Sequence, residues 1–210
     1  AWTSESHLGA LLLATQMHPA NCHQEGTWPM TQFMTRYSAI LWARDVRAIA
    51  DPKPLFTVES SRPVWWEKSV YRRPAPKGED ILLHLVNVPE TETVDVKRKE
   101  NPPSATGKVT FSIPAGKKLR KVFALQPRLY RPGVDSKLGC GLDVGGAPAV
   151  AVQEPDPKDP AKRIWVHKTG SLCRGGPSQV ELAATIADGK AGVTVPAFVY
   201  HTLLVFRLEE

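Results

Sequence analysis

The chain has 210 residues, of which 42% are hydrophobic and 23% are charged, and these shares are ordinary for a globular protein and exclude wholesale disorder. The formal net charge is +6, but the two densest basic runs, Val96–Lys99 and Lys117–Lys121, have no paired aromatic or Gly-Arg signature beside them. We therefore expect a mildly basic, solvated surface and no nucleic-acid partner. No apolar run approaches the roughly 20 residues that a transmembrane helix needs, so we expect no membrane span.

Residues 1–52 are predicted to be helical. A first helix has Leu8, Leu11 and Leu12 on one face and stops before Pro19, because a residue that precedes proline is disfavoured in the α region. A second helix is predicted from Pro29 to about Ile49, with the Asp51-Pro52 step as its end. Its apolar stripe has three- and four-residue spacing and contains Met30, Phe33, Met34 and Tyr37. Two helices cannot close a core alone, so this stripe needs a partner, either within the chain or on another polypeptide or copy.

From residue 53 to residue 210 the apolar period changes to two, which is typical of strands. Segment 131–160 is rich in Gly and Pro and is expected to hold only short strands, and Asp188-Gly189 is a hairpin turn pattern. Strands that follow helices, rather than alternate with them, indicate separate layers or domains. The predicted class is α+β, mainly β, with a helical segment at 1–52 followed by an antiparallel β-sandwich of eight to ten strands at 53–210. The strands are expected at 54–59, 64–72, 81–88, 109–113, 119–125, 164–167, 180–186 and 199–208.

The densest group of reactive side chains is His18, Cys22, His23 and Glu25. Imidazoles, a thiol and a carboxylate are zinc-ligand types, but their spacing matches no zinc pattern. We expect no metal there, and we leave open whether the loop contacts a substrate or is simply polar. The sequence contains no nucleophile elbow, phosphate-binding loop or dinucleotide fingerprint, so neither a catalytic residue nor a cofactor is predicted.

Trp65 and Trp66 are adjacent on a predicted strand and should point to opposite faces. An exposed indole is a platform for stacking on a sugar ring, whereas sandwich strands also use tryptophan as core and edge cover. Both readings stay open. His84, His167 and His201 lie singly on predicted strands and are expected to be structural residues.

The three cysteines are Cys22, Cys140 and Cys173. Cys140 and Cys173 both lie in glycine-rich segments and are the pair expected to form a disulfide if the protein is exported. An odd count is equally compatible with free thiols. We expect an export signal or a larger segment to precede Ala1.

The order of elements resembles the C-terminal end of glycoside hydrolases in which a (β/α)₈ barrel precedes a β-sandwich, the dextranase and cycloisomaltooligosaccharide glucanotransferase group. The resemblance rests on a long helix ending near Asp51-Pro52, the strand Asp80-Ile-Leu-Leu-His-Leu-Val-Asn87, the stretch Val193-Thr-Val-Pro196 and a last apolar strand at 200–208. It implies that residues 8–49 are the end of a barrel. The family's catalytic carboxylates would then lie before Ala1, so no catalytic residue carries over. The residues that would line the barrel's site are His18, His23, Glu25 and Trp28.

The resemblance implies a secreted, periplasmic or cell-surface protein whose sandwich supports the barrel or binds a polysaccharide. Two alternatives remain: an assembly module that docks through the stripe of the second helix, and a self-standing carbohydrate-binding module that uses Trp65 or Trp66.

Overall fold

The computed structural model describes residues 10–15, 28–88, 103–127, 143–144, 147–157, 159–169 and 177–210. Strands form most of this part of the chain, and every strand pair is antiparallel, so the predicted mainly-β class is confirmed. The strands fall into three sheets, which we call the large sheet, the small sheet and the outer hairpin sheet.

The large sheet has seven strands, and β3 pairs with β5 beside the main path. Its main path runs in the order β1 (Arg47–Ala48), β4 (Val70–Ala75), β5 (Gly78–Asn87), β14 (His201–Glu209), β7 (Lys118–Gln126) and β11 (Ser178–Leu182), and β3 is Val64–Trp65. The small sheet has the order β12 (Ala184–Ala187), β13 (Lys190–Phe198), β6 (Ala105–Ser112) and β2 (Phe56–Ser60). The outer hairpin sheet has the order β10 (Asp159–Thr169), β9 (Ala147–Asp156) and β8 (Asp143–Val144).

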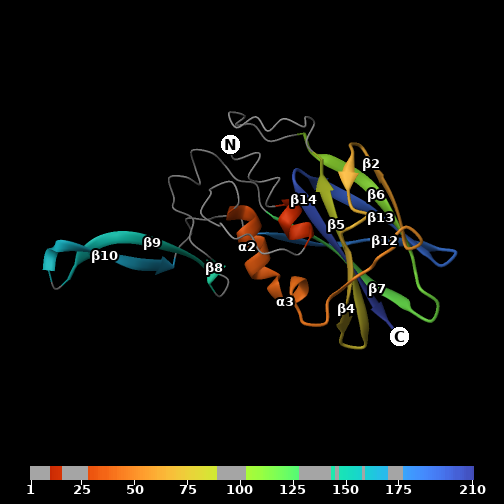
Figure 1. Ribbon diagram of the computed structural model, residues 1–210, viewed down its shortest axis with the longest axis horizontal. Coiled ribbons are helices and arrows are strands. Elements are labelled where there is room, and N and C mark those ends of the chain that lie inside the picture. Colours follow the sequence, from red (N-terminus) through yellow and green to blue (C-terminus); the bar gives the residue numbers. More distant parts are fainter. Residues whose placement is uncertain are drawn as a thin grey trace.

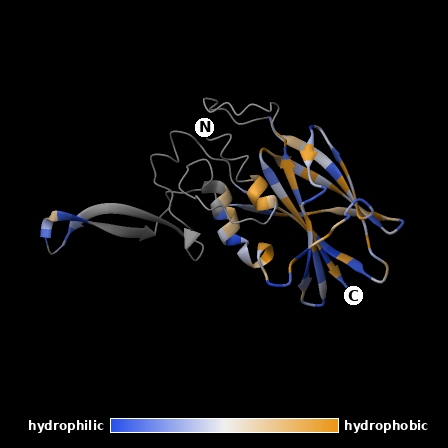
Figure 2. Ribbon diagram, viewed as in Figure 1, coloured by the Kyte–Doolittle hydropathy of each residue, from blue (hydrophilic) through white to orange (hydrophobic). Residues whose placement is uncertain are grey.

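The large and small sheets bury one apolar core between them, as expected of a sandwich. Alternate residues of the central strand β5 enter this core, among them Ile81 and Leu83, and Phe206 of β14 enters beside them. The ring of Phe206 lies 4.8 Å from that of Phe111 and 5.3 Å from that of Phe56, between centroids. Figure 2 shows hydrophobic residues along the strands of the two sheets.

Helices cover the opposite face of the large sheet. They are α2 (Trp28–Arg36), α3 (Ser38–Leu41) and a turn of helix at residues 10–14. Their apolar side chains share a second core with Leu82 and Val86 of β5 and with Leu203 and Val205 of β14. The sandwich therefore has three layers, with the helices beside the large sheet (Figure 1). No helix in the described parts of the chain is long and apolar enough to cross a membrane.

The apolar stripe of α2 finds its partner within the same chain. Met30, Phe33, Met34 and Tyr37 are 1%, 0%, 2% and 6% exposed, and all four belong to the core between helices and large sheet. The stripe is therefore not available in this structure as a docking surface for a second polypeptide, which was one of the two partners expected from its spacing.

The second helix is shorter than predicted. Tyr37 leaves the helical conformation (φ −107°, ψ 19°), Trp42 ends α3, and no helix continues to Ile49. Instead β1 pairs with β4, and the amide of Ile49 donates a hydrogen bond to the carbonyl of Val70. The backbone N–H and C=O groups of this segment, which was predicted to be helical, form their hydrogen bonds with the edge of the sheet instead.

Several strand boundaries also differ from the prediction. β9 is ten residues long, although segment 131–160 was expected to hold only short strands. The strand predicted at 180–186 is two strands, β11 and β12, which belong to different sheets, and 64–72 divides into β3 and β4. The large and small sheets hold seven and four strands, more than the eight to ten expected.

Two local predictions are confirmed. β5 is central in the large sheet and is buried on both faces from Asp80 to Asn87. Asp188 and Gly189 join β12 to β13 with φ values of 49° and 71°, the left-handed backbone that a two-residue hairpin turn requires.

Candidate functional site

Polar side chains lie on the helix-side face of the large sheet, among the apolar residues that hold the helices. Because side chains alternate along a strand, β5 presents Asp80 and His84 on this face and β14 presents His201 and Arg207. The four side chains form two groups, a histidine pair beneath the helices and a carboxylate with an arginine further along the sheet.

The histidine pair joins the two central strands. His84 lies opposite Leu203 in the register of β5 and β14, and His201 lies opposite Val86, so the two imidazoles are diagonal neighbours. The Nδ1 atom of His84 is 3.0 Å from the Nε2 atom of His201. The ring of His84 lies 5.7 Å from that of Tyr71, and the ring of His201 lies 5.4 Å from that of Phe33 of α2, between centroids, and both contacts are near-perpendicular. The pair therefore forms part of the contact between sheet and helix.

The other ring nitrogens of the pair have no hydrogen-bond partner in the described part of the chain. His84 is 0% exposed and His201 is 1% exposed, and the Nε2 atom of His84 and the Nδ1 atom of His201 make no hydrogen bond. Each neutral imidazole has one N–H and one bare nitrogen, so either tautomer of the pair leaves one buried donor and one buried acceptor unsatisfied. Such groups cost about 1–3 kcal/mol each.

Burial keeps both imidazoles neutral. Desolvation lowers the pKa of His84 to about 3. Desolvation also lowers the pKa of His201 well below its ordinary value, and repulsion from a charged His84 lowers it further. Neither ring can gain a proton near neutral pH while the helices cover it, so we assign the pair no role in acid–base catalysis.

Tyr71 links β4 to the first helical turn. Its hydroxyl donates a hydrogen bond of 3.0 Å to the carbonyl oxygen of Ala14, and burial raises the pKa of the phenol. The last carbonyls of a helix have no partner within the helix, so the phenol satisfies one of them. This bond connects residues 57 positions apart in the sequence.

We expect Tyr71→Phe to lower the free energy of unfolding by about 1 kcal/mol, because it removes this hydrogen bond and keeps the ring. Urea denaturation followed by tryptophan fluorescence measures the change. No change would mean that the bond to Ala14 contributes nothing to the docking of the first helical turn.

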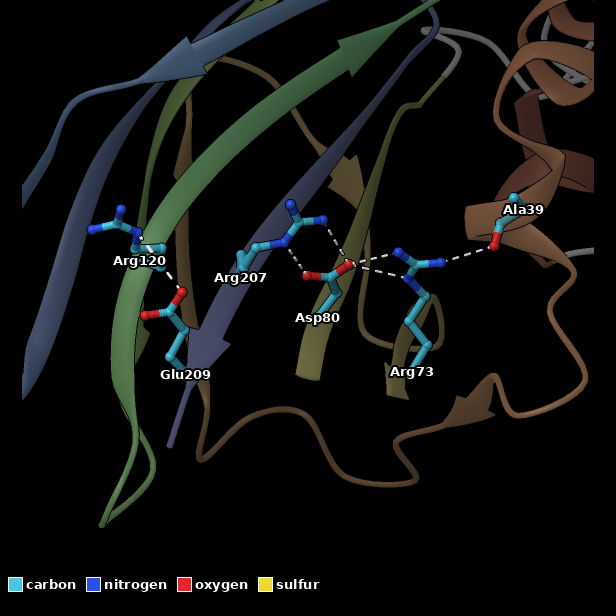
Figure 3. A network of polar contacts seen from close by, with 6 residues as sticks. All are labelled: Ala39, Arg73, Asp80, Arg120, Arg207 and Glu209. Atoms are coloured by element: carbon cyan, nitrogen blue, oxygen red, sulfur yellow. Dashed lines mark hydrogen bonds and ion pairs between the residues drawn. The ribbon is translucent and has the colours of Figure 1, made fainter. Parts of the chain in front are cut away.

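The second group of side chains is centred on the carboxylate of Asp80, which is fully buried (Figure 3). Arg73 of β4 donates to its Oδ2 atom from Nε at 3.1 Å and from Nη2 at 2.9 Å. Arg207 of β14 donates from Nε to Oδ1 at 2.9 Å and from Nη2 to Oδ2 at 3.2 Å. The hydrogen bonds to Asp80 raise the pKa of Arg207.

Arg73 extends this network to the helices. Its Nη1 atom donates a hydrogen bond of 2.8 Å to the carbonyl oxygen of Ala39 in α3. One guanidinium therefore connects α3, β4 and β5, and Asp80 connects these to β14 (Figure 3). Both oxygens of Asp80 are occupied by charged donors, so this carboxylate is suited to holding elements together and not to proton transfer.

The tryptophans flank opposite sides of the large sheet. Trp65 packs partly against the core beneath the helices, and Trp66 packs partly against the core between the sheets. Both are half-buried, so their predicted opposite directions are confirmed while each retains some exposed surface.

The other predicted site residues lie outside the part of the chain that the structure describes, so their grouping stays a prediction. His18, His23, Glu25, Cys140 and Cys173 lie outside it. Trp28 begins α2 and His167 lies in β10, but their side chains are also outside it. Among the residues described, no three or more His, Cys, Asp or Glu side chains are grouped as metal ligands would be.

The chain matches no protein-family model and no curated protein sequence. The resemblance to glycoside hydrolases therefore rests on the order of elements in the sequence alone.

A small cavity of about 140 Å³ lies where β7 ends and β13 turns into β14. The side-chain amide of Gln126 in its wall already donates to the carbonyls of Pro196 and Ala197. Small-molecule sites usually measure about 300–1,000 Å³, so this cavity is too small to be a substrate site.

Sequence reasoning missed the histidine pair because His84 and His201 are 117 positions apart. Both occur in runs that are apolar on both faces, Ile81–Val88 and Tyr200–Phe206. A histidine in such a strand has no route to solvent and needs a polar partner, and this was the feature from which a pair could have been predicted.

Proposed function

We propose that this chain is the C-terminal, non-catalytic part of an exported glycoside hydrolase-like protein. In this proposal, the helices of residues 1–52 are the end of a (β/α)₈ barrel, and the sandwich holds that end in place. The catalytic carboxylates belong to an earlier part of the same protein.

The observation that carries the proposal is the contact between the helices and the large sheet. A free-standing sandwich would present a polar outer face, but here Leu82, Val86, Leu203 and Val205 face the helices and are at most 5% exposed. Hydrogen bonds from Tyr71 and Arg73 to helix carbonyls add polar connections to this apolar contact. A sheet with such a face is adapted to hold a helical neighbour.

The chemistry of the described residues agrees with a supporting role. Glycosidases need two carboxyl groups, about 5–9.5 Å apart, on either side of the bond that is cleaved. The buried carboxylate of the described part of the chain is Asp80, and two arginines occupy it. We therefore expect no hydrolysis of polysaccharide by this chain alone.

The test is the mass of the native protein, isolated from its source under non-denaturing conditions. We expect the 23.1 kDa chain to be contained in, or to remain bound to, a larger polypeptide that hydrolyses or transfers glycosyl groups. Isolation of the chain only as a monomer or as multiples of itself would reject the proposal.

A second candidate function is glycan binding, which the partial exposure of Trp65 and Trp66 favours. On this hypothesis, Trp65→Ala or Trp66→Ala abolishes retardation of the protein in gels that contain dextran or another soluble polysaccharide. Trp42→Ala is the matched control, because Trp42 is also a half-buried indole that packs on the helix-side core. Equal retardation of all the variants and the unsubstituted chain would exclude both tryptophans as sugar platforms.

A further inference from the structure

The position of the histidine pair makes it sensitive to whether the helices are docked. His84 and His201 lie on the face of the large sheet that the helices cover, and Phe33 of α2 contacts the imidazole of His201 directly. If the helices left this face, water would reach both rings. If the helices stay, each ring remains in an apolar environment.

The described groups around the pair offer no negative charge to a protonated imidazole. Tyr71 faces His84 from β4, with its hydroxyl committed to Ala14. From α2, Phe33 faces His201, and the ring of Tyr37 lies 4.8 Å from that of Phe33, between centroids. The exposed Arg36 lies over the ring of Tyr37 and, as a cation, brings no negative charge to the pair.

The charged groups of the same strands lie further along the face. Asp80 is four residues from His84 in β5, about 13 Å along an extended strand, and is neutralised by Arg73 and Arg207. A first proton on the pair would therefore be an uncompensated charge in an apolar contact. A second proton would also place two N–H groups against each other and break the hydrogen bond between the rings.

We propose that the His84–His201 pair makes the docking of the helices acid-sensitive, so that undocking of the helices from the large sheet becomes more favourable as the pH falls from 7.5 to 5 while the two-sheet sandwich stays folded. The sandwich is expected to persist because its own core lies on the opposite face of the large sheet and contains neither histidine. This inference rests on the docking of the helices and not on the proposed function.

The direction of the pH effect on docking follows from which state, docked or undocked, binds more protons. With the helices docked, the pKa of His84 is about 3, whereas an exposed histidine has a pKa of about 6.5. Between these values the undocked state holds protons that the docked state lacks, so docking is fully favoured above about pH 7 and weakens as the pH falls. From pH 7.5 to pH 5, one histidine raises the undocking equilibrium constant about 30-fold and two raise it about 10³-fold.

Amide hydrogen exchange of the whole 210-residue chain at pH 7.5 and pH 5, corrected for the intrinsic exchange rates, tests the proposal. Helices as short as α2 and α3 are not stable alone in water, so their amides exchange when they undock. We expect the protection of residues 30–41 to fall by 30-fold to 10³-fold at pH 5, and that of β6 and β13 to change by less than about threefold.

Two variants separate titration of the pair from general weakening. The double variant His84→Leu, His201→Leu removes both titrating groups and should abolish the pH dependence in residues 30–41. Tyr71→Phe weakens the same contact at both pH values equally, so its protection should be lower throughout with an unchanged ratio between them. If the double variant does not fold, the unsubstituted chain and Tyr71→Phe still give the decisive ratios.

Three results would overturn the proposal. The first is a change of less than about threefold in residues 30–41 of the unsubstituted chain. The second is an equal loss of protection in β6 and β13, which would mean that acid unfolds the whole sandwich. The third is an undiminished pH dependence in the double variant, which would place the titrating groups elsewhere.

Discussion

Asp80→Asn is expected to lower the free energy of unfolding by about 3 kcal/mol, at the lower end of the 3–5 kcal/mol typical when one partner of a buried ion pair is removed. The carboxylate accepts hydrogen bonds from both Arg73 and Arg207. The asparagine amide has the same shape, but its NH₂ group would face arginine N–H groups, and an NH₂ group cannot accept hydrogen bonds from them. The side chain of Arg207 is 37% exposed, so water relieves part of the loss on that side. Urea denaturation at pH 7.5, with the slope m compared as well as the midpoint, measures the change.

The matched control is Glu181→Gln, which removes the carboxylate from an ion pair at the surface. Glu181 lies 3.0 Å from Lys121, but the two side chains are 54% and 41% exposed, so the expected loss is below about 1 kcal/mol. A loss in Asp80→Asn no larger than in Glu181→Gln would show that burial adds nothing to the central network. A second comparison, Arg73→Lys, retains the charge but not the fork that reaches both Asp80 and Ala39, and should lose stability as well.

Part of this network could be predicted from the sequence. Arg73 and Asp80 belong to the hairpin of β4 and β5, which turns at residues 76–77, and its register places them directly opposite each other. A predicted hairpin at this turn would therefore have paired them. Arg207 is 127 positions from Asp80, and no local pattern indicates that β14 lies beside β5. Contacts of this kind depend on the order of strands in the sheet, and the spacing of apolar residues predicts strands but not their order.

In the helical segment, too, some features could be predicted from the sequence and others could not. Apolar spacing in α2 correctly identified the side chains that become buried and correctly indicated that they need a partner. It did not identify the partner as the large sheet, and it extended the helix past Leu41 through Val46 and Ile49, because the Asp51-Pro52 step was interpreted as the end of the helix. Those residues serve the sheet instead, since Ile49 packs against the core between the sheets and bonds to Val70.

The two faces of the large sheet differ in what they pack against and in their polar content. One face closes a sandwich core made only of apolar residues, whereas the other holds helices with apolar contacts, a histidine pair and an arginine network. Buried polar groups at an interface cost stability unless hydrogen bonds or opposite charges satisfy them, and satisfied groups favour one particular arrangement. The histidine pair and the arginine network both lie on the helix-side face, so we expect the contact between helices and large sheet to depend on them.

Phe206→Ala is expected to lower the free energy of unfolding by about 3–5 kcal/mol, the range for truncating a buried phenylalanine. Phe206 is fully buried in β14, between β5 and β7, and its ring is in contact with Phe56 and Phe111 of the small sheet. Removal of the ring leaves a cavity between two sheets whose backbones are fixed by hydrogen bonds, so the cavity cannot collapse fully.

Chemical denaturation of Phe206→Ala, Phe206→Leu and Ile186→Ala measures this effect against two controls. Phe206→Leu fills most of the cavity and should cost less than about half as much, while Ile186 is 56% exposed and its truncation should stay within about 0.5 kcal/mol. Equal losses in Phe206→Ala and Ile186→Ala would contradict a tightly packed core between the sheets. Because Leu203 and Val205 of the same strand hold the helices, Phe206→Ala should also lower the amide protection of residues 30–41 at neutral pH. That loss should accompany one in β6, which distinguishes a failure of the sandwich from separation of the helices alone.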